Sequence, residues 1–110
     1  VCSSDLETPD VDVVMALNDR SALGALAAIE SMEIDNVLVY GVDGSPDVKE
    51  LINTGLIQAT AAQSPVKMGQ LAYQKAKALL ENKKIEKKIE VPVELISRDN
   101  ISNFELTGWQ

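Results

Sequence analysis

Three polar residues stand at equivalent places in the chain. Asn18, Asp43 and Gln63 each come just after an apolar segment and just before a predicted helix start. An ionised carboxylate accepts hydrogen bonds from two adjacent hydroxyls, and side-chain amides both donate and accept. A sugar hydroxyl also donates and accepts, so these side chains together suit a polyhydroxyl ligand.

Each of the three residues also has an ordinary structural interpretation. Asn18 is of a type favoured at helix N-termini, where its side chain caps the backbone. The same explanation is weaker for Asp43, because Ser45 already stands where a cap is needed. Gln63 has no capping preference, so its alternative role is that of a solvated surface amide.

Apolar segments alternate with helical patterns along the chain. Residues 37–42 lack polar alternation, which predicts a buried parallel strand, and strands are also predicted over residues 11–17 and 57–62. Residues 89–95 alternate between apolar and polar types, and Pro92 marks that strand as an edge or a crossover. Helices are predicted over three segments: from Asp19 or Ser21 to about Met32, residues 46–53, and residues 65–81.

Local residues mark the helix ends. Ser45 and Ser64 are placed to cap, Pro46 and Pro65 fit first turns, and Gly55 is a helix stop. The resulting β-α-β-α-β-α-β order predicts an α/β fold with a partial doubly wound parallel sheet. In such sheets ligands bind at the carboxyl ends of the strands, where the three polar side chains would meet.

Composition narrows the chemistry. The chain of 110 residues has a net charge of -7 and a pI near 4.4, which argues against nucleic acid or an anionic membrane as partner. It has no histidine and one cysteine, which excludes histidine-based catalysis, Cys-His or Ser-His-Asp triads and a zinc cluster within this chain. No dinucleotide or P-loop glycine motif is present. We therefore predict no catalytic residues, no metal and no cofactor.

The two ends of the sequence carry no regular pattern. Residues 1–6 match the in-frame translation of a common sequencing-adapter tail, so we expect natural sequence to begin near Glu7; a disordered terminus is the alternative. Residues 98–110 are predicted to form a loop anchored by Phe104 and Trp109. Trp109 could pack or stack on a ligand, and we expect packing.

Four motifs in order resemble one known family, the periplasmic sugar-binding proteins of the ribose/galactose type, which are the receptors of ABC sugar importers. The motifs are Ala16-Leu17-Asn18-Asp19, Ala22-Leu23-Gly24-Ala25, Gly41-Val42-Asp43-Gly44-Ser45-Pro46-Asp47 and Thr60-Ala61-Ala62-Gln63-Ser64-Pro65. The resemblance implies that Asn18, Asp43 and Gln63 hydrogen-bond a sugar. It implies no role for residues 98–110.

The resemblance also implies a C-terminal fragment of a longer type I periplasmic-binding-protein fold, in which sugar is clamped between two lobes. Residues 7–63 would be the C-terminal half of the second lobe. Residues 64–96 would return to the first lobe and include the last crossover, and residues 97–110 would form a C-terminal loop.

The implied ligand is a monosaccharide of the ribose, galactose, glucose or xylose class, and the implied partner is the membrane permease of the importer. The implied full-length protein is a monomer, either periplasmic or a lipoprotein on the outer side of the bacterial cytoplasmic membrane.

Two other classes of function remain for comparison. The effector-binding domain of a lac-repressor-type transcription regulator shares the fold. The turn at Gly44-Ser45-Pro46-Asp47 and the crossover at Ala62-Gln63-Ser64-Pro65 look more like the transport receptors. An enzyme would need a nucleophile–base pair or a cofactor motif, neither of which is present.

Overall fold

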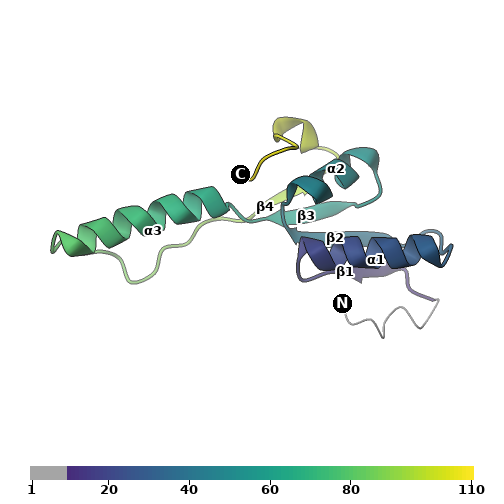
Figure 1. The fold of residues 1–110 in the computed structure, drawn as a ribbon, viewed down its shortest axis with the longest axis horizontal. Coiled ribbons are helices and arrows are strands. Elements are labelled where there is room, and N and C mark those ends of the chain that lie inside the picture. The colour runs from purple at the N-terminus through teal and green to yellow at the C-terminus, as the bar shows by residue number, and fades with distance from the viewer. Residues whose placement is uncertain (1–9) are drawn as a thin grey trace.

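The protein consists of a layered body and a long arm (Figure 1). The computed structural model describes residues 10–110, so the prediction for residues 1–6 lies outside the described residues. The elements in chain order are β1 (Val13–Met15), α1 (Asp19–Ser31), β2 (Leu38–Asp43), α2 (Pro46–Thr54), β3 (Ala59–Ala62), α3 (Pro65–Leu80), β4 (Glu94–Ser97) and the 3-10 turn η2 (Ile101–Asn103). The predicted alternation of strands and helices is confirmed.

One sheet contains all four strands, in the order β1-β2-β3-β4. β1, β2 and β3 are parallel, as predicted, but β4 runs antiparallel to β3. The prediction of an all-parallel sheet is therefore wrong for the last strand. The reason is visible in Figure 1: α3 leads away from the sheet instead of crossing it, so the returning chain enters β4 in the reverse direction.

Helices cover one face of the sheet. Val14, Val39 and Ile96 face the helices and are buried, together with side chains of α1 and α2. Neighbours along the strands point the opposite way and are exposed, Met15 by 74%. Right-handed connections that step in one direction along a sheet place their helices on the same face. The described residues thus supply one of the two helical layers of a doubly wound fold.

The helix-end predictions hold for α2. The Ser45 hydroxyl accepts a hydrogen bond from the Val48 backbone N–H, Pro46 begins the helix, and Gly55 ends it with a φ of 89°. Ser64 differs from its prediction, because it makes no side-chain capping bond at the start of α3. A side-chain hydrogen bond therefore caps the start of α2 in the body, whereas no such bond caps the start of α3 in the arm.

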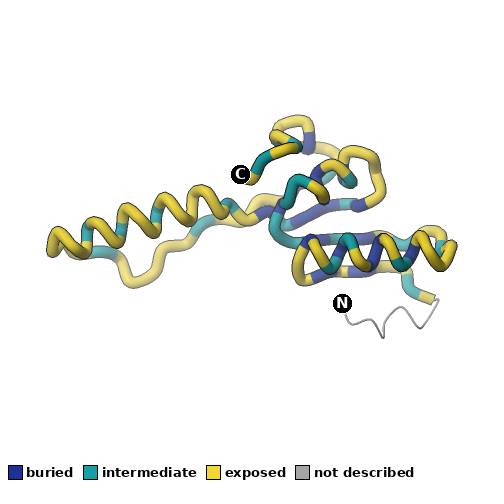
Figure 2. The backbone as a smooth tube through the Cα atoms, viewed as in Figure 1, coloured by how far each residue is buried: buried dark blue, intermediate teal, exposed yellow. Residues whose placement is uncertain are grey.

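The arm consists of α3 and the returning residues 81–93. None of the residues in α3 is buried, and almost the whole arm is exposed in Figure 2. The radius of gyration of 17.6 Å exceeds the roughly 13 Å of a compact chain of this length. The strand predicted over residues 89–95 begins only at Glu94, because no strand lies beside the preceding residues.

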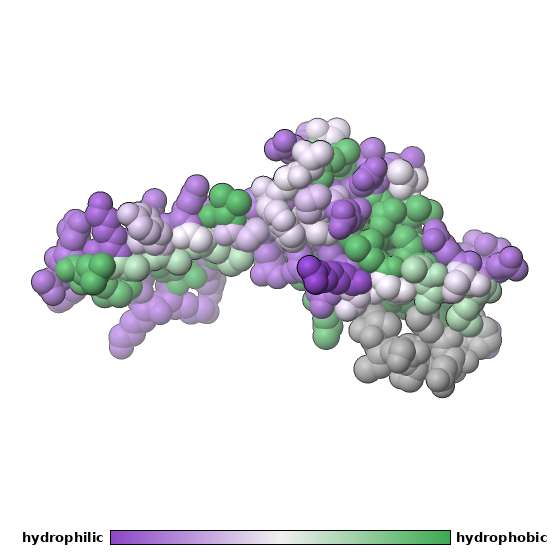
Figure 3. All heavy atoms as spheres, viewed as in Figure 1, coloured by the Kyte–Doolittle hydropathy of each residue, from purple (hydrophilic) through white to green (hydrophobic). Residues whose placement is uncertain are grey.

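Hydrophobic side chains lie on the surface of this arm (Figure 3). Val66, Tyr73 and Leu79 are exposed, and Leu80 is exposed by 85%. The spacing of seven residues places Val66, Tyr73 and Leu80 on one side of α3, where they form an apolar stripe. Contiguous exposed apolar side chains of this kind often mark a surface that packs against another protein segment.

Candidate functional site at the sheet edge

The three polar residues singled out in the sequence lie at one edge of the sheet. Asn18 follows β1, Asp43 is the last residue of β2, and Gln63 directly follows β3. Because these strands are parallel neighbours, their carboxyl ends form a common rim. Asp43 occupies the middle strand, so it lies between the other two residues.

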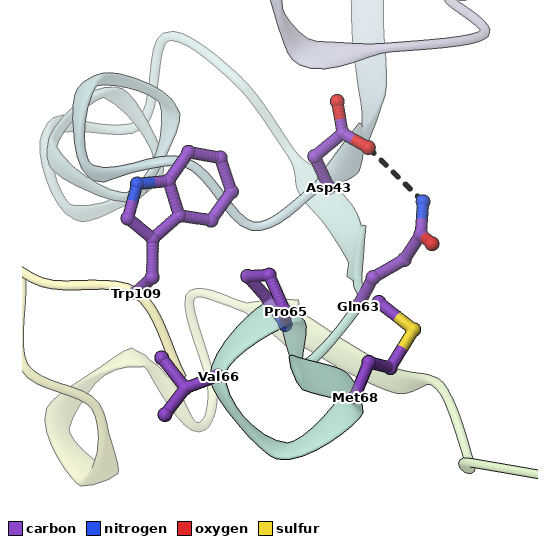
Figure 4. A pocket seen from close by; sticks show the side chains of 6 residues that line it. All are labelled: Asp43, Gln63, Pro65, Val66, Met68 and Trp109. Carbon is purple, nitrogen blue, oxygen red and sulfur yellow. Dashed lines mark hydrogen bonds between the residues drawn. The ribbon is translucent and has the colours of Figure 1, made fainter. Parts of the chain in front are cut away.

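Asp43 and Gln63 are in direct contact. The Gln63 Nε2 donates to the Asp43 Oδ1 at 3.1 Å, and both side chains border the same hollow (Figure 4). Gln63 also donates its backbone N–H to the Asp43 carbonyl at 3.1 Å. One contact uses only one carboxylate oxygen, which leaves Asp43 with acceptor capacity toward a ligand.

The backbone of Asp43 is strained. Its φ is 125°, a value that residues with a side chain rarely adopt and that costs on the order of 1–3 kcal/mol. Hydrogen bonds on either side hold it there, because Gly44 donates its N–H to the Thr60 hydroxyl and Gln63 donates to the Asp43 carbonyl. Such strain is concentrated at binding sites, where it fixes the direction of a side chain.

Asn18 caps α1. Its Oδ1 accepts a hydrogen bond from the Ser21 backbone N–H at 2.8 Å, as the structural interpretation of this residue requires. Capping uses only the oxygen of the amide. The Nδ2 group makes no hydrogen bond to residues 10–110, so the capped geometry leaves a fixed donor at the rim.

Asp19, which the sequence indicates only as a possible start of the first helix, is a structural residue. It is buried, its Oδ1 accepts from the Thr60 hydroxyl at 2.7 Å, and its Oδ2 accepts from the Ser45 backbone N–H at 2.6 Å. A Cβ at position 41 would overlap Asp19, which explains Gly41 within an apolar strand. This carboxylate therefore joins the starts of α1 and α2 to β3. A glycine within an apolar strand, Gly41, is the only sequence signal of this contact, and its meaning depends on the register that places Gly41 beside Thr60.

Two hollows flank Asp43. One, of about 550 Å³, is lined by Asp43, Gln63, Pro65, Val66, Met68 and Trp109. The other, of about 690 Å³, is lined by Asn18 and the starts of α1 and α2, again with Asp43 and Trp109. Asn18 and Gln63 thus lie on opposite sides of Asp43. The first hollow combines a few polar groups with mostly apolar side chains, as is typical of small-molecule sites, whereas the second is lined mainly by polar and charged residues.

Trp109 borders both hollows, with a side chain that is half exposed. The sequence left packing and ligand stacking open for this residue and favoured packing. Its place depends on how residues 104–110 fold back over the rim, which no local pattern predicts.

Residues 10–110 contain no group of three His, Cys, Asp or Glu side chains arranged to hold a metal ion. None of the helices in this part of the chain combines the length and apolar character that crossing a bilayer requires.

The sequence profile of the periplasmic binding protein domain matches residues 3–84 of the chain. The match covers most of the sequence and includes all three rim residues. The chain belongs to the periplasmic binding protein family.

Individual relatives agree with this assignment. The ribose import binding protein RbsB of Bacillus subtilis is 44% identical over 87 residues, and that of Escherichia coli is 39% identical over 88 residues. These alignments cover 79% and 80% of this chain but only 28% and 30% of the relatives. The chain therefore spans less than a third of the curated relatives that it matches.

A solved structure has the same fold. The ABC transporter periplasmic solute binding protein of Actinobacillus succinogenes, with bound D-allose, superposes with a TM-score of 0.85 at 28% identity. The superposition covers 89% of this chain and 35% of that protein.

Proposed function

We propose that this chain is part of a receptor for an ABC sugar importer and that its rim binds a monosaccharide. Asn18, Asp43 and Gln63 supply hydrogen bonds to the sugar hydroxyls. The observation that supports the proposal is the position of these three residues along one sheet edge, with Gln63 in contact with Asp43 and Asn18 on the other side of Asp43, in a member of the periplasmic binding protein family. The relatives named above import ribose or hold D-allose, which supports a sugar of similar size.

Each of the three side chains would form a different set of hydrogen bonds to the sugar hydroxyls. The Asp43 carboxylate accepts from two neighbouring hydroxyls, in part through the oxygen that Gln63 does not contact. On one side of Asp43 the Asn18 Nδ2 group donates to a sugar hydroxyl. On the other side the Gln63 amide donates to or accepts from another hydroxyl. A hydroxyl that both donates and accepts is satisfied by this combination, whereas an apolar ligand would leave the rim groups unpaired.

The chain accounts for one wall of the proposed site. The exposed apolar arm and the uncovered face of the sheet are surfaces where the rest of a complete receptor would pack. We propose that residues 7–63 belong to the second lobe, that α3 extends into the first lobe, and that closure of the lobes surrounds the sugar. Such a receptor acts outside the cytoplasmic membrane, as a monomer and without catalysis, and delivers the sugar to a membrane permease.

A regulator of the lac-repressor type would use the same fold for an effector. The named relatives are import or transporter proteins, which favours transport. The gene upstream distinguishes the two: an export signal or lipobox supports the receptor, and a helix-turn-helix supports the regulator.

The test is calorimetric titration of the complete gene product with D-ribose, D-allose, D-galactose, D-glucose and D-xylose. We expect binding of at least one sugar. Asp43→Ala should weaken it by about 1.5–3 kcal/mol, roughly 10- to 150-fold in Kd, because a charge-assisted hydrogen bond is lost. Asp35→Ala removes the same charge from an exposed loop away from the rim and should leave Kd unchanged. Equal Kd values for the Asp43 variant and the wild type would remove Asp43 from the site.

A further inference from the structure

The segment after η2, residues 104–110, is attached to the rim itself. The Gln110 Nε2 donates to the Gln63 carbonyl at 2.9 Å and to the Asp43 carbonyl at 3.3 Å. The two backbone groups that carry the candidate ligand residues of β2 and β3 are therefore hydrogen-bonded to this segment. Gly44 permits the approach, because a Cβ there would overlap the Gln110 side chain and Ala62.

A buried lysine holds the same segment from the other side. Lys49 on α2 is only 1% exposed, and its ammonium donates to the backbone carbonyls of Glu105 and Gly108 and to the Gln110 Oε1. Burial lowers the pKa of Lys49, and the charge of Glu105 opposes this shift. A buried ammonium must be hydrogen-bonded to be tolerated. The hydrogen bonds that stabilise the buried Lys49 ammonium therefore also fix the backbone of residues 105–110 beside α2.

Trp109 lies between the two attachment points, Gly108 and Gln110. Its indole is 50% exposed and lines both hollows beside Asp43. Figure 4 shows the ring across the hollow from Asp43 and Gln63, with Pro65 between them. A large aromatic side chain whose backbone is fixed on both sides, and which still faces an open hollow, is placed to contact a ligand.

The side chains of Asp43 and Trp109 suit different parts of a sugar. A pyranose or furanose presents hydroxyls at its edge and C–H groups on its faces. A carboxylate suits the edge, and the large apolar face of an indole suits the C–H groups.

We infer that Trp109 packs against the apolar face of the sugar whose hydroxyls Asp43 binds, and that Lys49 is a positioning residue that fixes Trp109. The inference rests on the proposed function of the rim. The alternative, that the indole contacts only the other lobe, is an outcome of the test.

The test uses the complete gene product and the sugar of the panel that it binds, starting with D-ribose and D-allose. Trp109→Ala should raise Kd roughly tenfold, and Trp109→Phe should raise it only a few-fold because an aromatic face remains. Leu56→Ala truncates a similarly exposed side chain at the opposite end of the body (45% exposed) and should leave Kd unchanged.

The outcomes separate the inference from the proposed function. If Asp43→Ala weakens binding while Trp109→Ala does not, the inference is overturned and the sugar site stands; this is also the result expected if the indole contacts only the other lobe. If the wild type binds no sugar in the panel, both are overturned.

The role of Lys49 is tested by coupling. Lys49→Met keeps the length of the side chain but removes its three donors, and it should weaken binding about as much as Trp109→Ala. The double variant should bind no worse than either single variant, because both changes remove one contact. Additive losses would show that Lys49 affects binding independently of Trp109, and an unchanged Kd for Lys49→Met would show that Lys49 acts only on stability; either result overturns its role in positioning Trp109. If circular dichroism shows that Lys49→Met does not fold, the two Trp109 variants decide the ligand contact by themselves.

Discussion

The body and the arm place similar apolar side chains in opposite surroundings. α2 in the body buries its apolar residues Val48 and Ile52 completely, each 0% exposed. α3 in the arm is longer and also carries an apolar stripe, yet none of its residues is buried. The sequence pattern of a helix therefore determines that it has one apolar face. Whether that face is buried depends on which other elements of the fold lie beside it.

The largest difference should appear in core truncation. In the 110-residue chain, Ile52→Ala should lower the free energy of unfolding by about 2–5 kcal/mol, because it leaves a cavity in the body. Leu80→Ala in the arm should change it by less than about 0.5 kcal/mol, because the side chain is exposed. Urea denaturation followed by circular dichroism measures both. Equal losses would mean that α3 packs against the body in solution.

The buried hydrogen bonds beneath the rim should have the next largest effect. Thr60→Val keeps the shape of the side chain but leaves Asp19 and the Gly44 N–H without their partner, at a cost of about 1–3 kcal/mol. Thr54→Val makes the same chemical change at an exposed position and should have little effect. The same denaturation assay applies. A Thr60 variant as stable as the wild type would show that the hydrogen bond between Thr60 and Asp19 does not stabilise the rim.

The two helix starts offer a closely matched pair. Ser45→Ala should cost about 1 kcal/mol because its hydroxyl caps α2. Ser64→Ala at the start of α3 should cost almost nothing, because Ser64 makes no side-chain capping bond. Thermal unfolding of the two variants measures the difference, and a larger loss for Ser64→Ala would reverse the comparison.

The smallest effect is expected for sugar binding by the 110-residue chain alone. Titration of the 110-residue chain alone with ribose, galactose, glucose or xylose should give no heat, since one wall of a site lacks the enclosure that excludes water. Micromolar binding by this chain would show that the rim needs no second lobe.

Much of the body could be predicted from the sequence because its signals are local. Ser45, Pro46 and Gly55 define α2 within a few residues. The rim could also be predicted, because residues that end parallel strands must meet at one edge. The capping role of Asn18 stayed open in the sequence and is resolved by its bond to Ser21.

The remaining features depend on contacts far apart in the chain. The direction of β4 follows from the path of α3, for which no short motif exists. The burial of Asp19 depends on the register that places Gly41 beside Thr60. Lys49 is of a type that is almost always exposed, so neither its burial nor the position of Trp109 could be expected.

The most direct test of the sugar site is a crystal structure of the complete gene product with its bound sugar. The account predicts sugar hydroxyls within hydrogen-bond distance of the Asp43 carboxylate and of the Asn18 and Gln63 amides, at the carboxyl ends of β1, β2 and β3. A sugar bound elsewhere, with these three side chains facing solvent, would contradict it.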